Sequence, residues 1–184
     1  MARLMTPRPP TVAERMLAVR GLVCDVDGVL TDGKLNYFGS DEMKSFSVLD
    51  GFGITLAKQA GWKVAMLTAR GGPAVERRAR ELDVELVSGE RNKGVAFAAI
   101  CERWALPAAN VAYIGADWLD LPALVQAGLA ATVPNAAAAV RQRAHWLATL
   151  NGGDGAVREM IEAVLRVQGR LDELVQRYLT GSGT

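Results

Sequence analysis

The chain has 184 residues, half of them hydrophobic, so it can bury one sizeable core within a single domain. Its 21 Lys and Arg against 20 Asp and Glu give a formal net charge of +1, which excludes a general attraction to nucleic acid or anionic membranes. No apolar run approaches the roughly 20 residues that cross a bilayer. Cys24 and Cys101 form neither a CxxC pair nor a disulfide framework. This cysteine usage favours a reducing, cytoplasmic setting.

The first residues are expected to be a flexible lead. Met1 to Pro10 contains two arginines and three prolines, without an apolar run of signal-peptide length. We therefore expect residues 1–16 to be flexible and residues 17–184 to form a single domain that includes a C-terminal helical tail.

After the lead, short aliphatic runs alternate with segments of helical period. The runs predict strands at 21–25, 63–68, 84–87, 111–114 and 129–133, and the segments between them predict helices near 53–60, 73–82, 93–104 and 119–127. Asn135 is expected to be the N-cap of a further helix. This alternation is typical of an α/β fold with a doubly wound parallel sheet.

Two regions depart from the alternation. After the first strand, residues 34–38 and 43–47 flank the turn-rich residues 39–42, which predicts a β-hairpin insertion that could cover a site. Near the end, the glycine-rich residues 151–155 precede a long amphipathic segment, 156–179, which Gly169 interrupts. We expect this tail to pack on another subunit.

Polar residues gather where the predicted strands end, which is where open α/β sheets bind ligands. The set consists of Asp25, Asp27, Thr68, Arg70, Lys93, Asp117 and Asp120. Together these residues could hold a phosphoryl group.

The expected chemistry is phosphoryl transfer to a carboxylate. Asp25 would attack phosphorus, and Asp27 would protonate the leaving alcohol and later deprotonate a water molecule. Thr68 would donate a hydrogen bond to a phosphate oxygen, and Lys93 would supply a cation. The hard divalent ion expected beside such groups is Mg²⁺.

Two further cations have open roles. Arg70 stands beside Thr68, so it could contact the phosphate or sugar, or it could form a surface ion pair. Lys44, on the predicted hairpin, has the same two possibilities.

Four segments in order resemble the motifs of haloacid dehalogenase-like phosphatases. They are DVDGVLTDG at 25–33, LTAR at 67–70, Lys93, and YIGADWLD at 113–120. The hairpin and GGDGAVRE at 152–159 narrow the resemblance to the 3-deoxy-manno-octulosonate 8-phosphate phosphatase family of lipopolysaccharide synthesis. This resemblance covers nearly the whole chain after about residue 16.

The resemblance implies a Rossmann-like fold without a large cap domain and hydrolysis of a sugar-acid phosphate through an aspartyl phosphate. We expect Mg²⁺ to be held by Asp25, Asp27 and Asp117, and Arg70 and Lys44 are the candidate substrate-binding residues. It also implies a homotetramer in which hairpins and tails reach neighbouring sites. Nucleic acid and membranes are not expected partners.

Two positions depart from the family pattern. Ala116 stands where the family has a metal-binding aspartate, and Asp154 stands where an arginine is common. Asp117 could shift inward, water could fill the gap, or Mg²⁺ could bind weakly, and weakened binding is our expectation. The alternatives are a phosphatase of a related sugar acid, such as a nine-carbon one, and a weakly active or non-catalytic oligomeric protein.

Overall fold

A twisted parallel sheet forms the centre of the protein. The computed structural model describes residues 8–39 and 41–183. In these residues the sheet has the order β5-β4-β1-β6-β7-β8, and its neighbouring strands all pair in parallel. Its strands are β1 Gly21–Cys24, β4 Lys63–Thr68, β5 Glu85–Ser88, β6 Val111–Ile114, β7 Leu129–Thr132 and β8 Trp146–Leu147. All five expected strands are confirmed, and β8 is too short for a periodic pattern to reveal.

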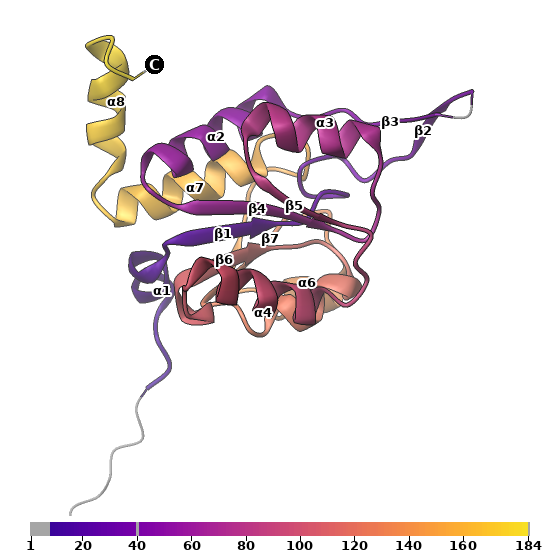
Figure 1. Cartoon of the computed structure of the whole chain (residues 1–184). Coiled ribbons are helices and arrows are strands. Elements are labelled where there is room, and N and C mark those ends of the chain that lie inside the picture. The colour runs from indigo at the N-terminus through magenta and orange to yellow at the C-terminus, as the bar shows by residue number, and fades with distance from the viewer. Residues whose placement is uncertain (1–7, 40, 184) are drawn as a thin grey trace, which may run out of the picture.

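Helices cover both faces of the sheet (Figure 1), so the doubly wound α/β prediction is confirmed. One face carries α2 Val48–Gln59, α3 Pro73–Leu82 and α7 Ala156–Val167, and the other carries α4 Lys93–Trp104 and α6 Ala138–Arg141. The short helix α5 Leu121–Leu124 packs against α4. Short 3-10 turns occupy η1 Ala108–Asn110 and η2 Trp118–Asp120. The largest fully buried side chains, Tyr113 and Phe97 among them, lie between the sheet and these helices.

The flexible lead expected over residues 1–16 overlaps a helix. Residues Val12–Ala18 form helix α1, whose N-terminus carries a capping box in which Thr11 and Glu14 bond to each other. Met16 is buried in the core. The boundary drawn at residue 16 is therefore wrong, because a helix with a complete cap crosses it; residues 1–7 lie outside the described part.

The hairpin and the tail both extend from the body of the molecule (Figure 1). The hairpin consists of β2 Asn36–Phe38 and β3 Asp41–Met43, paired antiparallel. Gly169, with φ of 68°, separates α7 from α8 Leu171–Leu179, as expected. No large cap domain is present in the described residues.

Two helix starts differ from expectation. Helix α2 begins at Val48 because the Ser47 hydroxyl accepts hydrogen bonds from Leu49 and Asp50 amides. Helix α6 begins at Ala138 with Ala137 as its N-cap, so the N-cap role expected for Asn135 is wrong. The Asn135 side chain instead contacts two other loops.

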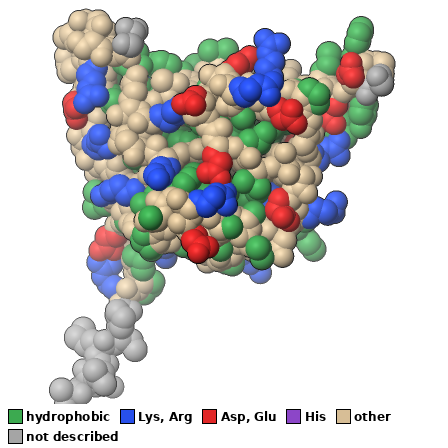
Figure 2. Space-filling view, in the orientation of Figure 1, with side chains coloured by type: hydrophobic (Ala, Val, Ile, Leu, Met, Phe, Trp, Pro, Cys, Tyr) green, Lys and Arg blue, Asp and Glu red, His purple; other side chains and the backbone are tan. Residues whose placement is uncertain are grey.

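Acidic and basic side chains are mixed over the face shown in Figure 2, in keeping with the near-zero net charge. Among residues 8–39 and 41–183, none of the helices combines the length and apolar character needed to cross a membrane.

Candidate active site

Asp25 lies directly after β1, in the middle of the sheet, and is only 4% exposed. Its amide continues the strand pairing by donating to the Ile114 carbonyl at 3.0 Å. Its Oδ1 atom accepts a hydrogen bond from the Val26 amide at 2.7 Å, which fixes the carboxylate at the carboxyl end of β1. Backbone contacts therefore position both the main chain and the side chain of the predicted nucleophile.

Lys93 joins two buried carboxylates. Its Nζ atom lies 2.6 Å from Asp25 Oδ1 and 2.6 Å from Asp120 Oδ1. Asn92 caps α4 by accepting from the Val95 amide, and this cap sets the start of the helix at Lys93. The lysine thus reaches from α4 to the end of β1.

Asp120 belongs to the polar set at the strand ends, and its contacts define its role. Its Oδ1 atom accepts from the Tyr113 hydroxyl at 2.6 Å, and its Oδ2 atom accepts from the Ala116 and Asp117 amides at 2.8 and 2.9 Å. Asp120 therefore shapes the loop after β6 and anchors Lys93. The sequence signal for this structural role is the spacing of three residues between Asp117 and Asp120, which permits the capping box seen here.

The contacts among Asp25, Lys93 and Asp120 shift the pKa values of Asp25 and Lys93. Burial and the nearby Asp120 carboxylate raise the pKa of Asp25 to about 8, and Lys93 acts in the opposite direction. Burial tends to lower the pKa of Lys93, but Asp25 and Asp120 outweigh it, so the net shift is upward. Lys93 therefore stays charged, and further positive charge would favour ionised Asp25.

Asp27 belongs to a second charged group. Lys44, from the segment after β3, contacts the Asp27 carboxylate, and its side chain is only 3% exposed. Lys44 Nζ also lies 2.7 Å from Glu42 Oε1, and Arg70 Nη2 lies 2.8 Å from Glu42 Oε2. Glu42 therefore pairs with both Lys44 and Arg70, the two candidate substrate-binding residues. The sequence reasoning missed Glu42.

Thr68 closes β4 and is 1% exposed. Its hydroxyl donates to the Arg70 carbonyl and accepts from the Arg70 amide, both at 3.1 Å. These bonds fold the LTAR segment back on itself and place Thr68 at the same end of the sheet as Asp25.

The side chains expected to bind metal do not form one tight cluster. In the described part of the chain, no group of three or more His, Cys, Asp or Glu residues stands ready to hold an ion. Asp27 and Asp117 do line one cavity, of about 480 Å³, together with Asp32, Asn135 and the Ala116 methyl group. Because Mg²⁺ commonly takes one or two protein carboxylates and keeps several waters, this oxygen donor set fits the ion.

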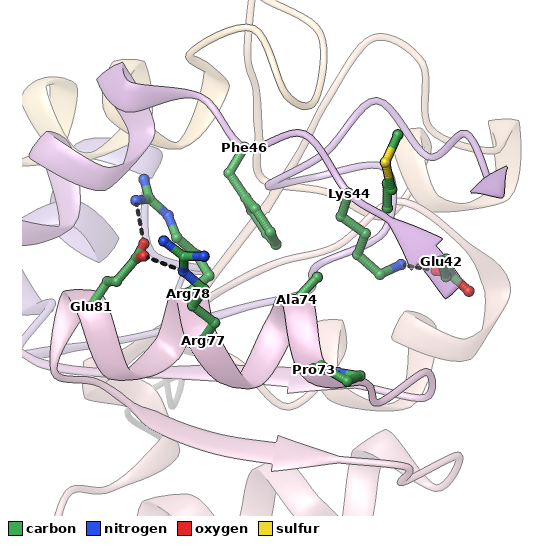
Figure 3. A pocket seen from close by; sticks show the side chains of 9 residues that line it. Glu42, Lys44, Phe46, Pro73, Ala74, Arg77, Arg78 and Glu81 are labelled. Atoms are coloured by element: carbon green, nitrogen blue, oxygen red, sulfur yellow. Dashed lines mark hydrogen bonds and ion pairs between the residues drawn. The ribbon is translucent and has the colours of Figure 1, made fainter. Parts of the chain in front are cut away.

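A cleft of about 600 Å³ opens beside the second charged group, between α3 and the segment after β3 (Figure 3). Glu42 and Lys44 line one end of it. At the other end Arg78 donates to the Ser47 carbonyl at 3.1 Å and lies over the Phe46 ring. Arg78 thereby fastens α3 to the segment that connects the hairpin with α2.

Comparisons with known proteins agree with this geometry. Residues 78–161 match the family model described as haloacid dehalogenase-like hydrolase. The 3-deoxy-D-manno-octulosonate 8-phosphate phosphatases of Salmonella typhimurium and Escherichia coli strain B are each 40% identical to this chain. The matches cover 94% of this chain and 93% and 94% of those proteins.

Solved structures give the same result. The Moraxella catarrhalis 3-deoxy-D-manno-octulosonate 8-phosphate phosphatase, in complex with magnesium, phosphate and KDO, is 33% identical with a TM-score of 0.88, covering 91% of this chain and 97% of that one. The cobalt-bound Haemophilus influenzae phosphatase is 34% identical with a TM-score of 0.86, covering 90% and 99%. This chain therefore belongs to the 3-deoxy-D-manno-octulosonate 8-phosphate phosphatase family of haloacid dehalogenase-like hydrolases.

Proposed function

We propose that this chain hydrolyses 3-deoxy-D-manno-octulosonate 8-phosphate to the free sugar acid and inorganic phosphate. The observation that carries the proposal is the buried Asp25 at the end of the central strand, 2.6 Å from the Lys93 ammonium. A carboxylate in this position can act as a nucleophile, and the adjacent lysine offsets the charge of an incoming phosphoryl group. Family membership names the substrate.

The reaction proceeds in two displacements. Asp25 forms an oxygen–phosphorus bond while the bond from phosphorus to the sugar oxygen breaks, and Asp27 gives that oxygen a proton. Asp27 then takes a proton from water as the water attacks the aspartyl phosphate, which releases phosphate and restores Asp25. Thr68 and Lys93 bind phosphoryl oxygens during both displacements.

Mg²⁺ is the cofactor in this proposal. Asp25, Asp27 and Asp117 would hold it, and the bound ion would offset the negative charge of the phosphoryl oxygens. Ala116 supplies no oxygen from its side chain, so the protein offers one carboxylate fewer than the family pattern. We therefore propose that the site binds Mg²⁺ more weakly than a site with aspartate at position 116.

Substrate selection is assigned to the second charged group. Arg70 and Lys44 are the cations proposed to meet the acidic sugar, and their position near Asp27 supports this role. Both now contact Glu42, so an acidic substrate would have to compete with that carboxylate.

Family membership disfavours the two alternatives, a phosphatase of a related nine-carbon sugar acid and a non-catalytic oligomeric protein. The deciding experiment measures phosphate release by the full chain, with excess Mg²⁺, from the eight-carbon and nine-carbon sugar-acid phosphates and from a neutral sugar phosphate. We expect the eight-carbon substrate to react fastest and Asp25→Asn to abolish release. Faster hydrolysis of another ester would overturn the substrate, and no release from any ester would overturn the activity.

We further infer that the protein is a cytoplasmic homotetramer built from one domain per chain. The hairpin supports an assembly because Tyr37, Phe38 and Met43 are 66%, 74% and 53% exposed, which is costly for apolar side chains in an isolated chain. Cys24 and Cys101 are free and buried, in keeping with a reducing compartment. Light scattering tests the assembly, and a stable monomer would contradict it.

A further inference from the structure

Three loops meet at Gly28, one residue after Asp27. The first is the nucleophile loop itself, residues 25–31. The second is the segment 133–137 after β7, and the third is the glycine-rich loop 151–155 before α7. The proposed mechanism needs Asp25 and Asp27 in fixed positions, but gives no task to the second and third loops.

The Asn135 amide bonds to both neighbouring loops. Its Nδ2 atom donates to the Gly28 carbonyl at 3.2 Å, and its Oδ1 atom accepts from the Gly152 amide at 2.8 Å. One side chain therefore uses its donor on the nucleophile loop and its acceptor on the glycine-rich loop.

The glycine-rich loop also contacts the nucleophile loop directly. The Gly153 amide donates to the Val29 carbonyl at 2.9 Å. A Cβ atom on Gly152 would overlap the Gly28 carbonyl oxygen, so only glycine permits this approach. The two backbones are thus in contact, and Asn135 closes the arrangement from the side.

The segment that carries Asn135 is fixed in turn to the loop after β6. The Ala137 amide donates to the Ala116 carbonyl at 2.9 Å, next to Asp117. Asn135 and Asp27 line the same cavity, so the side chain stands at the wall of the site. A displacement of residue 135 would therefore disturb both the nucleophile loop and the loop after β6.

We propose that Asn135 is a positioning residue, which holds the nucleophile loop against the glycine-rich loop so that Asp25 and Asp27 keep their reactive placement. This inference rests on the proposed phosphatase function. A misplacement of catalytic groups by about 1 Å can lower the rate a hundredfold. Loss of the Asn135 side-chain amide should therefore reduce kcat strongly and change KM little.

The test compares Asn135→Ala with Asn135→Asp. Alanine removes both bonds, whereas aspartate keeps an oxygen for the Gly152 amide, loses the donor to Gly28 and adds a negative charge to the cavity that Asp27 and Asp117 line, so all variants are assayed at saturating Mg²⁺. We expect Asn135→Ala to lower kcat by roughly 10- to 100-fold with KM changed less than about threefold. Asn135→Asp should recover most of the loss, since it keeps the shorter of the two bonds.

A readout other than activity accompanies the kinetics. Hydrogen exchange of peptides covering residues 26–31 and 150–155 should be faster in Asn135→Ala and closer to wild type in Asn135→Asp. The matched control is Asn110→Ala, because Asn110 Nδ2 also donates to a backbone carbonyl, that of Ala18 at 2.7 Å, at the opposite end of β6. We expect this control to leave kcat unchanged.

An unchanged kcat in Asn135→Ala would overturn the proposal, and so would a raised KM at unchanged kcat, because that result would make Asn135 a substrate contact. An equal loss of kcat in Asn110→Ala would also overturn it, as a general stability effect. If the wild-type protein released no phosphate, the proposed function would fail, while unchanged exchange in Asn135→Ala would separately refute the loop contact.

Discussion

Lys93 Nζ lies 2.6 Å from Asp120 Oδ1, and neither side chain is more than 3% exposed. A buried pair of this kind strongly destabilises a protein when one member is removed, because the remaining charge has no water to solvate it. Here Asp25 still pairs with Lys93 after such a change, so the cost should lie near the lower end of the usual range.

We expect Asp120→Ala to lower the free energy of unfolding by about 3 kcal/mol, since it also removes the acceptor of the Ala116 and Asp117 amides. Denaturant unfolding measures this change. Glu173→Ala is the control, because Glu173 and Arg177 form an exposed pair, for which about 0–1 kcal/mol is expected. Equal effects of the two variants would contradict the role given to Asp120.

Position 116 should control metal affinity. Ala116→Asp adds a carboxylate at the wall of the cavity that Asp27 and Asp117 line, so Mg²⁺ should bind at least about tenfold more tightly. Titration calorimetry with Mg²⁺ measures affinity without reference to turnover. The control Ala116→Asn introduces a side chain of the same size as aspartate but without charge, so it should raise the Mg²⁺ affinity much less. Wild-type binding as tight as that of Ala116→Asp would show that the alanine costs the site nothing.

Arg70 either binds the substrate or serves only as the ion-pair partner of Glu42, and kinetics can separate these roles. We expect Arg70→Ala to raise KM for the acidic sugar phosphate by roughly tenfold, because a charge-assisted bond is lost. Glu42→Gln removes the partner but keeps the cation, so it should not raise KM. If Arg70→Ala leaves KM unchanged, the contact with Glu42 at 2.8 Å is the whole role of Arg70.

His145 gives the protein a stability that depends on pH. Its Nδ1 atom accepts a hydrogen bond from the Ala130 amide at 3.0 Å, which requires that nitrogen to be unprotonated. Burial lowers the pKa of His145, and the nearby positive charge of Arg15 lowers it further. The unfolded chain therefore takes up a proton at higher pH than the folded protein. The contribution of His145 is fully present above about pH 6.5 and is lost as the pH falls toward the lowered folded pKa.

The measurement is the free energy of unfolding at pH 7.5 and pH 5.5 for wild type and His145→Asn, whose side chain offers an oxygen acceptor that does not titrate. Wild type should lose more stability than the variant over this interval. An equal loss in both proteins would assign the pH dependence to other groups.

The positions of the candidate site residues were most predictable from the sequence where those residues follow strands. Asp25, Thr68 and Asp117 each come just after or at the end of a strand, and parallel strands bring their carboxyl ends to one edge. The strand runs were readable because strands covered on both faces are almost entirely apolar. The same reasoning placed Lys93 at the start of α4.

Side-chain partners were less predictable. Nothing in the spacing of Glu42, Lys44 and Arg70 shows that one carboxylate binds both cations, because the hairpin and β4 meet only in three dimensions. Asn135 has the residue type of an N-cap, yet tertiary contacts with Gly28 and Gly152 take its side chain instead. Contacts between distant loops have no local signal.

The position of β1 has a consequence for how the protein fails under stress. The strand pairs with β4 on one side and β6 on the other, and all four of its residues are buried. Segments of this kind open only with the whole domain, whereas edge strands and surface helices open earlier. Since Asp25 follows β1 directly, partial fraying at the periphery leaves the proposed nucleophile in place. Peripheral openings that displace Lys44 and Arg70 should therefore be reversible, and a protein warmed below the global transition should regain full activity on cooling.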